Sequence, residues 1–390
     1  MSMSPPERVV VVGAGLAGGR TCAALRAAGF SGTIVLVGVE KHLPYDRPPL
    51  SKAVLSAGVD PDLGIDLEAL GVEPRLGVRA VGVDLQARLL ETDGGTESYD
   101  VLVLATGAEP VRLPGSGDQV TLRTLDDARE LRSRMVPGAR VVIIGAGWIG
   151  AEVATAALAA KCHVTCLEGA ATPLAGPLGE EVGARFMPWW QDVDLRLKVR
   201  VDRVEQHAVV LVDGEAVPAD VVVTGIGVRA DVAWLEKAGL VVGAGGVAVD
   251  ADRRTSDPHV YALGDIAARW SDRLRQRVHS GHWDEAANGP AAVTSAIMGT
   301  PRSLDEVPYF WSDQFGHKIQ YVGQHSSSDR VVLRHHADAE KWGAAWLDDD
   351  SRITAHLSVD FPKGMVRARA AISAGRVVDP DRCRDLAEAI

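Results

Sequence analysis

Short runs of purely apolar residues recur along the chain and predict strands that are buried on both faces. The first run spans residues 9–12 and a similar one spans 141–144. Each is followed at once by a glycine-rich turn and then by a segment that reads as a helix. A second segment that reads as a strand follows each helix, at 34–39 and at 163–167. This repeated order of strand, turn, helix and strand predicts two βαβ units with parallel sheets.

Both glycine turns carry the fingerprint G-x-G-x-x-G. Its first glycine allows the tight turn, its second lets a pyrophosphate approach the backbone, and its third lets helix and strand pack closely. The helix N-terminus then offers free N–H groups and a positive dipole end to the phosphates. The fingerprint residues are Gly13, Gly15, Leu16, Ala17 and Gly18 in the first copy and Gly145, Gly147, Trp148, Ile149 and Gly150 in the second.

An acidic residue completes each unit at the end of its second strand. These residues are Glu40 and Glu168, whose carboxylates suit a ribose with both hydroxyls free. Two complete units in one chain predict two dinucleotides, and the usual pair is FAD and a nicotinamide dinucleotide. Glu168 favours NADH over NADPH, because a 2′-phosphate would meet a like charge and find no arginine in residues 169–172.

Composition narrows the functional classes. The chain has 390 residues and a net charge of −11, which disfavours nucleic acid as a partner. No run of about 18 apolar residues exists, so no membrane span is expected. The polar start, residues 1–8, does not resemble a signal peptide, so a cytoplasmic location is expected. The four cysteines are interpreted as packing residues, and the eleven histidines form no metal-binding signature, so no metal is expected.

The domain organisation follows from the duplication and from a late signature. Gly264 and Asp265 end an apolar segment in a way typical of a strand that reaches a flavin, so the chain is expected to return to its first domain. From about residue 307 aromatic residues gather among alternating polar ones, which predicts a small antiparallel sheet and a final helix over 381–390. The predicted domains are an FAD-binding domain (1–115 and 237–306), an NAD-binding domain (116–236) and a C-terminal domain (307–390).

Several further motifs carry a family resemblance over essentially the whole chain. They are Pro-Tyr-Asp-Arg-Pro-Pro-Leu-Ser-Lys at 44–52, His-Trp-Asp-Glu-Ala-Ala-Asn-Gly-Pro-Ala-Ala at 282–292, and Trp-Ser-Asp-Gln at 311–314. With the two fingerprints, they resemble the FAD-dependent ferredoxin reductases, which include putidaredoxin reductase, rubredoxin reductase and the reductases of aromatic-ring dioxygenases. The resemblance implies an α/β fold with two Rossmann-like, glutathione-reductase-like domains and a small α+β C-terminal domain.

The resemblance also implies an activity. NADH would give a hydride to FAD, and the electrons would pass singly to a small 2Fe–2S ferredoxin that feeds an oxygenase such as a cytochrome P450 or a ring dioxygenase. Rubredoxin reductase and NADH oxidase remain as alternatives, although no cysteine occupies residues 44–52. A redox-sensing flavoprotein similar to apoptosis-inducing factor is the alternative outside enzymes. The sequence leaves open whether the protein is a monomer or a dimer.

Lys52 and Glu152 are the candidate catalytic residues. In the family this lysine lies near flavin N5 and pairs with the glutamate of the second fingerprint helix, so its charge would stabilise negative charge that develops on the flavin. The alternatives are a solvated loop lysine and a glutamate that merely favours the helix dipole.

Other candidates line the cofactors. Arg47 and Arg123 suit the FAD pyrophosphate, Asp265 suits FAD hydroxyls, and Trp283 is expected beside the flavin. Ordinary ion pairs, a turn acid and a core tryptophan are the respective alternatives. The remaining predicted cofactor-binding residues are Ala80, Ala105, Thr106, Gly107, Gly264, Gly225, Ile226 and Gly227.

Two predictions concern surfaces. Trp148 is either a movable aromatic lid over the nicotinamide site or a packing residue.

Because the chain and most ferredoxins are both acidic, docking requires a local basic patch. The candidate patches are Arg269, Arg273, Arg275 and Arg277, or Lys363, Arg367 and Arg369.

Overall fold

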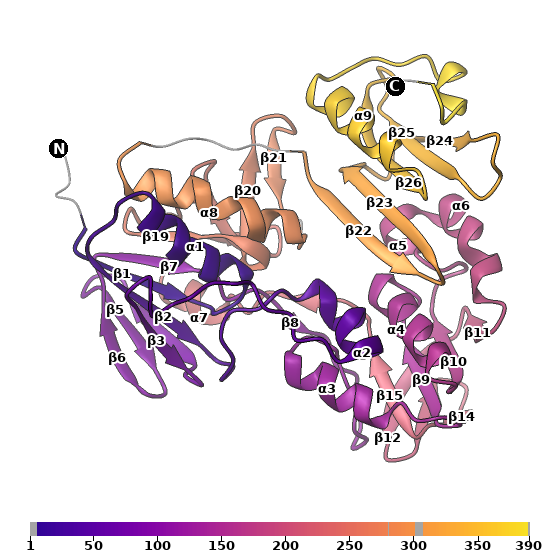
Figure 1. The fold of residues 1–390 in the computed structure, drawn as a ribbon, viewed down its shortest axis with the longest axis horizontal. Coiled ribbons are helices and arrows are strands. Elements are labelled where there is room, and N and C mark those ends of the chain that lie inside the picture. Colours follow the sequence, from indigo (N-terminus) through magenta and orange to yellow (C-terminus); the bar gives the residue numbers. More distant parts are fainter. Residues whose placement is uncertain (1–5, 280, 301–306, 389–390) are drawn as a thin grey trace. The chain divides into compact units, whose positions relative to one another are not determined.

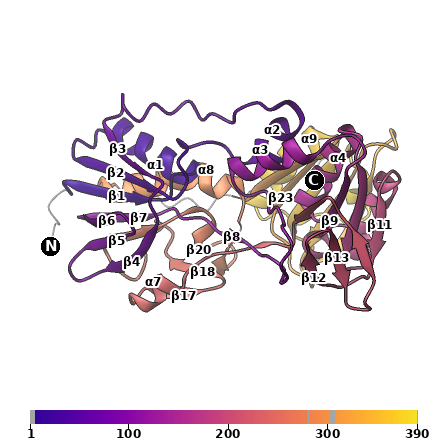
Figure 2. The ribbon, with the colours of Figure 1, turned by 90° about the horizontal axis from the view of Figure 1, so that it is seen from below.

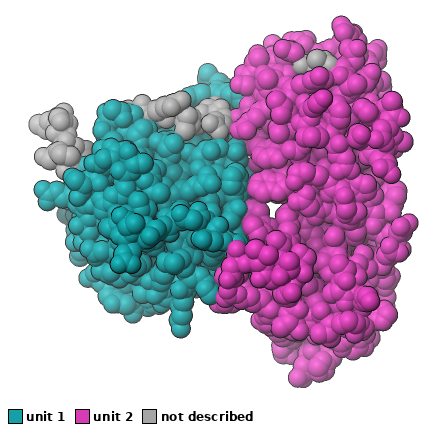
Figure 3. All heavy atoms as spheres, in the orientation of Figure 1, with its two compact units in different colours: residues 1–47, 61–109, 228–306 teal, residues 48–60, 110–227, 307–390 magenta. Residues whose placement is uncertain are grey.

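The computed structural model describes residues 6–279, 281–300 and 307–388, and the chain forms two compact units (Figure 3). Each unit is assembled from three separate segments of the chain. The first unit comprises Met1–Arg47, Pro61–Glu109 and Val228–Glu306, and the second comprises Pro48–Asp60, Pro110–Gly227 and Val307–Ile390. The short strands β8 (Glu109–Pro110) and β16 (Val228–Arg229) lie where the chain passes between them. The domain boundaries predicted above stay a prediction.

A five-stranded parallel sheet forms the centre of the first unit. Its strand order is β19-β7-β1-β2-β3, with β1 (Arg8–Val12), β2 (Thr33–Gly38), β3 (Val72–Leu76), β7 (Val101–Leu104) and β19 (Val260–Ala262). Because β19 pairs with β7, the chain returns to its first sheet late in the sequence, just before Gly264.

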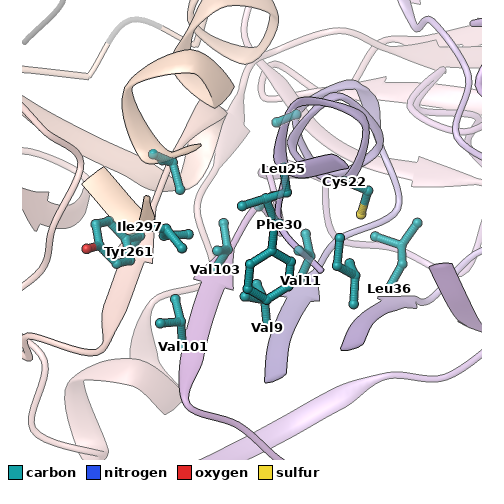
Figure 4. Packing of buried hydrophobic residues seen from close by; sticks show 14 of the residues in the cluster. Val9, Val11, Cys22, Leu25, Phe30, Leu36, Val101, Val103, Tyr261 and Ile297 are labelled. Atoms are coloured by element: carbon teal, nitrogen blue, oxygen red, sulfur yellow. The ribbon is translucent and has the colours of Figure 1, made fainter. Parts of the chain in front are cut away.

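Both faces of the sheet are covered at β1, β2, β7 and β19, as uninterrupted apolar runs predict, whereas the edge strand β3 is largely exposed. Val9 and Val11 lie in a core with residues of α1 (Leu16–Ala27) and α8 (Trp283–Ile297), such as Leu25 and Ile297 (Figure 4). Val10 and Val12 face the opposite core. Figure 2 shows α1 on one side of the sheet and further elements on the other. Those labelled there are β4 (Ala80–Asp84), β5 (Leu89–Thr92), β6 (Gly95–Ser98), α7 (Ala233–Lys237), β17 (Val242–Gly243), β18 (Gly246–Val249) and β20 (Ala267–Ser271). The unit also contains η3 (Gly264–Ile266) and β21 (Gln276–Val278).

The second unit contains the second predicted βαβ arrangement. Its parallel sheet has the order β11-β10-β9-β15, and α4 (Trp148–Ala159) connects β9 to β10. The strands are β9 (Arg140–Ile144), β10 (His163–Glu168), β11 (Asp194–Leu197) and β15 (Val221–Thr224), and an antiparallel sheet of β12 (Val201–Glu205), β13 (Ala208–Leu211) and β14 (Ala216–Pro218) packs with them. The other elements are η1 (Pro48–Ser51), α2 (Ala53–Ala57), α3 (Leu125–Arg134), α5 (Ala175–Leu178), α6 (Glu180–Gly183) and η2 (Ala184–Trp190).

A five-stranded antiparallel sheet completes the second unit, which confirms the predicted C-terminal sheet. Its order is β22-β23-β26-β25-β24, with β22 (Tyr309–Gln314), β23 (His317–Gly323), β24 (Arg330–His335), β25 (Trp342–Leu347) and β26 (Ile353–Val359). Side chains of this sheet, including Tyr321, Trp342 and Leu357, share one core with Leu174 and Phe186.

The predicted final helix over 381–390 is wrong. The C-terminal helix is α9 (Pro362–Ser373), and only the short 3-10 turn η4 (Arg382–Arg384) follows it among the described residues. The cause is Arg334 of β24, which is buried and donates hydrogen bonds to the carbonyl oxygens of Cys383, Asp385 and Glu388. These carbonyls are held by a side chain instead of by helical N–H groups. Residues 389 and 390 lie outside the described part.

No helix in the described ranges has the length and apolar character needed to cross a membrane. All four cysteines are buried and unbridged, and burial raises the pKa of the Cys22 thiol to about 12, so this thiol stays protonated at neutral pH. Within the described ranges, no group of three or more His, Cys, Asp or Glu residues could hold a metal ion.

Candidate active site

Two of the three glycines of the first fingerprint have a steric reason within the chain, and the third lies beside open space. Gly13 has a φ of +112°, and a Cβ there would clash with the carbonyl oxygen of Ala105. A Cβ on Gly18 would clash with the carbonyl oxygen of Gly13, so helix and turn pack as closely as predicted. In contrast, a Cβ on Gly15 would meet only Nη1 of Arg47, at 3.9 Å. The space over Gly15 is therefore open on the side from which a pyrophosphate would approach.

The second fingerprint repeats this geometry. Gly145 has a φ of +102°, and a Cβ there would lie 2.6 Å from the carbonyl oxygen of Gly225. A Cβ on Gly150 would clash with the carbonyl oxygen of Gly145, whereas one on Gly147 would meet nothing within 4 Å. Both turns thus leave open space beside their second glycine, Gly15 or Gly147, and this space fits a dinucleotide. We call each of these open turns a glycine cradle.

Glu40, Tyr45 and Arg47 form a polar group beside the first cradle. The hydroxyl of Tyr45 donates to Glu40 Oε2 at 2.6 Å, and Arg47 Nη2 lies 3.0 Å from Glu40 Oε1. Burial raises the pKa of Tyr45 to about 12, so its hydroxyl remains a donor. Arg47 Nε is buried and has no hydrogen-bond partner within the part of the chain that the structure describes. A guanidinium with an uncommitted N–H next to an open glycine fits the pyrophosphate of FAD.

Trp283, at the start of α8, is hydrogen-bonded to the segment that contains Tyr45 and Arg47. Its Nε1 donates to Asp46 Oδ1 at 2.7 Å, and the guanidinium of Arg20 lies over its ring at 5.4 Å from the centroid. Arg20 also donates to the carbonyl of Ala287, in the same helix. The sequence indicated Trp283 and the motif that contains Asp46, but it indicated neither their contact nor Arg20, because both contacts join segments far apart in the chain.

The other predicted cofactor-binding residues of the first unit differ in how deeply they are buried. Asp265 is half-buried, its carbonyl is hydrogen-bonded to His279 Nε2 at 2.7 Å, and Gly264 has a φ of +73°. Thr106 is exposed directly after β7, and Gly107 has a φ of +74°. Ala80 packs against the hydrophobic core at the start of β4. The contacts of these residues with a cofactor stay a prediction.

Glu168 fixes the turn of the second fingerprint. Its Oε2 accepts the N–H of Ala146 at 2.7 Å, and its Oε1 accepts the N–H of Ala170 at 2.8 Å. Each carboxylate oxygen keeps a further lone pair for a ribose hydroxyl. Beside this turn, Ile149 and Ile226 leave apolar side chains exposed, and Gly227 follows with a φ of +110°.

Lys52 and Glu152 form the predicted ion pair, although they are 100 positions apart. Lys52 Nζ lies 2.9 Å from Glu152 Oε1, and the side chains are 21% and 2% exposed. Two hydroxyls, of Ser51 and Ser312, also donate to this carboxylate. The pair therefore lies at the boundary of the interior, with the carboxylate inside and the ammonium reaching the surface. The sequence indicated the ion pair through the family resemblance and missed both serines.

The structure overturns the role predicted for Arg269 and leaves that of Arg123 a prediction. Arg269 is buried beside Glu285, with 3.6 Å between Nε and Oε2, so it cannot belong to an exposed docking patch, and that part of the prediction is wrong. Arg123 donates its backbone N–H to Asp127 in the capping box at the start of α3. Its predicted contact with FAD remains untested.

Trp148 is half-buried and packs in the second unit. Its ring centroid lies 4.9 Å from that of Phe310, and it lies against the core that contains Leu174 and Trp342. These contacts favour the packing interpretation over a movable lid.

Replacing Trp148 with alanine should lower the free energy of unfolding by about 2 kcal/mol, because a half-buried aromatic contact is lost. The affinity for NADH should stay the same. Denaturant unfolding and NADH titration measure the two effects. A variant with unchanged stability but tighter NADH binding would support the lid instead.

Comparison with known proteins agrees with this geometry. Residues 7–298 match the pyridine nucleotide-disulphide oxidoreductase family, and residues 309–390 match the reductase C-terminal family. The ferredoxin–NAD(+) reductase component of the anthranilate 1,2-dioxygenase system of Burkholderia cepacia is 35% identical, over 96% of each chain. The crystal structure of Fdr9 superposes with a TM-score of 0.95 at 50% identity and covers 98% of this chain and 99% of that one. The covalent putidaredoxin reductase–putidaredoxin complex gives a TM-score of 0.91 at 31% identity, over 97% and 96%.

Proposed function

Because this chain belongs to the pyridine nucleotide-disulphide oxidoreductases, and within them to the ferredoxin reductases, we propose that it carries electrons from NADH through FAD to a small 2Fe–2S ferredoxin. The ferredoxin would supply an oxygenase, such as a ring dioxygenase or a cytochrome P450. The observation that carries this proposal is the pair of open glycine cradles together with the Lys52–Glu152 ion pair. The buried, unbridged cysteines and the use of NADH support a cytoplasmic setting.

FAD, when bound, supplies hydride acceptance and one-electron transfer, and the chain supplies binding, orientation and charge. Arg47 would neutralise the pyrophosphate over Gly15, and Glu40 would accept ribose hydroxyls. Glu168 would do the same for NADH in the second unit. Lys52 would hold a fixed positive charge toward the flavin ring, where negative charge develops during reduction.

Electron delivery to the ferredoxin should weaken as salt concentration rises, because exposed charges are screened over about 10 Å at 0.1 M ionic strength. The exposed Arg275 remains a candidate contact on the first unit, and Lys363 and Arg367 on the second. Arg275→Glu should raise the apparent KM for ferredoxin and leave the reduction of a small neutral dye unchanged. If it does not, the corresponding Lys363→Glu and Arg367→Glu variants test the other surface.

The decisive experiment is anaerobic turnover with NADH and a panel of purified 2Fe–2S ferredoxins. Fast reduction of at least one ferredoxin supports the proposal. Faster reduction of rubredoxin, or turnover that needs only oxygen, would favour the two alternative enzymes. A long-lived reduced protein that passes electrons to none of these acceptors would favour a redox sensor.

A further inference from the structure

One face of helix α4 is turned toward the C-terminal sheet of its own unit (Figure 1). Trp148, Glu152 and Thr155 are spaced by four and three residues, so they lie on one side of the helix. Each contacts a different position of β22 or of the turn that follows it. The partners are Phe310 by ring packing, Ser312 by its hydroxyl, and the backbone N–H of Phe315, which donates to Thr155 Oγ1 at 2.9 Å.

The middle contact of this face is chemically unusual because it involves a buried charge. Glu152 receives three donors: the ammonium of Lys52 and the hydroxyl of Ser312 on Oε1, and the hydroxyl of Ser51 on Oε2. A carboxylate removed from water needs such donors, since one ion pair alone does not replace its hydration. The donors come from two parts of the chain, residues 51–52 and residue 312, and they engage both carboxylate oxygens, which holds the carboxylate in one orientation.

Gln314 decides which way the Ser312 hydroxyl points. Its Nε2 donates to Ser312 Oγ at 2.9 Å, and both residues are buried. A serine oxygen that accepts this hydrogen bond has one hydrogen of its own to donate. That hydrogen goes to Glu152.

Lys52 is the most exposed residue of this network of hydrogen bonds. Besides Glu152, its ammonium donates to the carbonyl oxygen of Pro48 at 3.3 Å. An ammonium has three hydrogens, and among the described residues these two groups account for two of them. The Lys52 side chain is 21% exposed, so its third hydrogen can reach solvent or a ligand.

We propose that Ser51, Ser312 and Gln314 are positioning residues of the reductase, which hold Glu152 so that Glu152 in turn fixes the Lys52 ammonium. The C-terminal domain thereby contributes to hydride transfer through Ser312 and Gln314, in addition to any role in binding the partner. The consequence for hydride transfer rests on the function proposed above, whereas the effect on Lys52 itself does not.

The first test measures Lys52 directly in the FAD-loaded protein. Trace acetylation with acetic anhydride, followed by mass spectrometry, reports the reactivity of Lys52 relative to the exposed Lys41. Ser312→Ala and Ser51→Ala should each raise the relative reactivity of Lys52 about fivefold, the effect of one lost hydrogen bond. Gln314→Ala should raise it less, and Ser312→Thr and Ser51→Thr, which keep the hydroxyl, should restore the original value.

Ser358→Ala is the matched control. Ser358 is a buried serine of the same sheet, and its hydroxyl has no hydrogen-bond partner within the described ranges. It should leave Lys52 unchanged. Equal reactivity of Lys52 in Ser312→Ala, Ser51→Ala and Ser358→Ala would overturn the proposal, and if one serine variant does not fold, the other decides.

The second test is a double-mutant cycle on flavin reduction in stopped flow. Ser312→Ala should slow reduction at saturating NADH with little change in NADH affinity, and it should have no further effect in a Lys52→Met background. An equal slowing in both backgrounds would mean a general structural role and would overturn the positioning role. If Lys52→Met alone leaves the rate unchanged, the proposed function of Lys52 fails, while the acetylation result still decides whether the serines hold it.

Discussion

Lys52→Met should slow the reduction of bound flavin by NADH about a hundredfold while FAD remains bound, because one fixed donor at a site of developing charge is worth about 3 kcal/mol. Lys52 does not belong to either glycine cradle, so loss of its charge should leave the cofactor sites intact. Stopped-flow absorbance of the flavin measures the rate, and the bound flavin spectrum measures occupancy. Lys41→Met, at an exposed lysine, is the control and should reduce at the original rate.

The same substitution leaves the buried carboxylate of Glu152 without its ammonium, which should also destabilise the fold. The double variant Lys52→Met/Glu152→Gln removes the unpaired charge and separates the two effects. We expect it to recover most of the lost unfolding free energy, measured in denaturant, and none of the lost rate. Recovery of the rate together with stability would mean that the lysine acts only by supporting the fold.

The parts of the site that the residue pattern predicted without the family resemblance are those with local causes. Gly18 and Gly150 are needed because a side chain there would strike the carbonyl oxygen of the first glycine of the same turn, Gly13 or Gly145. The open position over Gly15 follows from the same short motif. Such constraints act within one βαβ unit, so a six-residue pattern is enough to predict them.

The residues that the sequence missed act across long separations. Ser312 is 160 positions from Glu152, and nothing near either residue indicates the contact. Arg334 likewise prevents a terminal helix by binding carbonyl oxygens about 50 positions away, which local helix signals cannot reveal. Arg269 looked like part of an exposed basic run, but its pairing with Glu285 brings it into the interior.

Glu168→Gln should reduce the preference for NADH over NADPH about a hundredfold in kcat/KM, which would remove most of it. The carboxylate is held by the N–H groups of Ala146 and Ala170, so it cannot turn away from a bound ribose. Unit charges about 4 Å apart repel by about 1 kcal/mol in bulk water and by about 4 kcal/mol near a protein surface. A 2′-phosphate carries nearly two charges, so a penalty of about 3 kcal/mol is reasonable even with partial screening.

Glutamine has the same size as glutamate and can still accept one of the two backbone N–H groups, so the turn should persist while the charge is lost. Glu40→Gln is the matched control, because Glu40 closely follows β2, the equivalent strand of the other unit. It should weaken FAD binding, by loss of its charged contact with Arg47, and leave the ratio of NADH to NADPH use unchanged in the FAD-loaded fraction. High salt should narrow the preference of the original protein and have little effect on the Glu168→Gln variant, since only a charge is screened. If Glu168→Gln retains the full preference at low salt, discrimination does not depend on the charge of Glu168, and the shape of the pocket must exclude the phosphate.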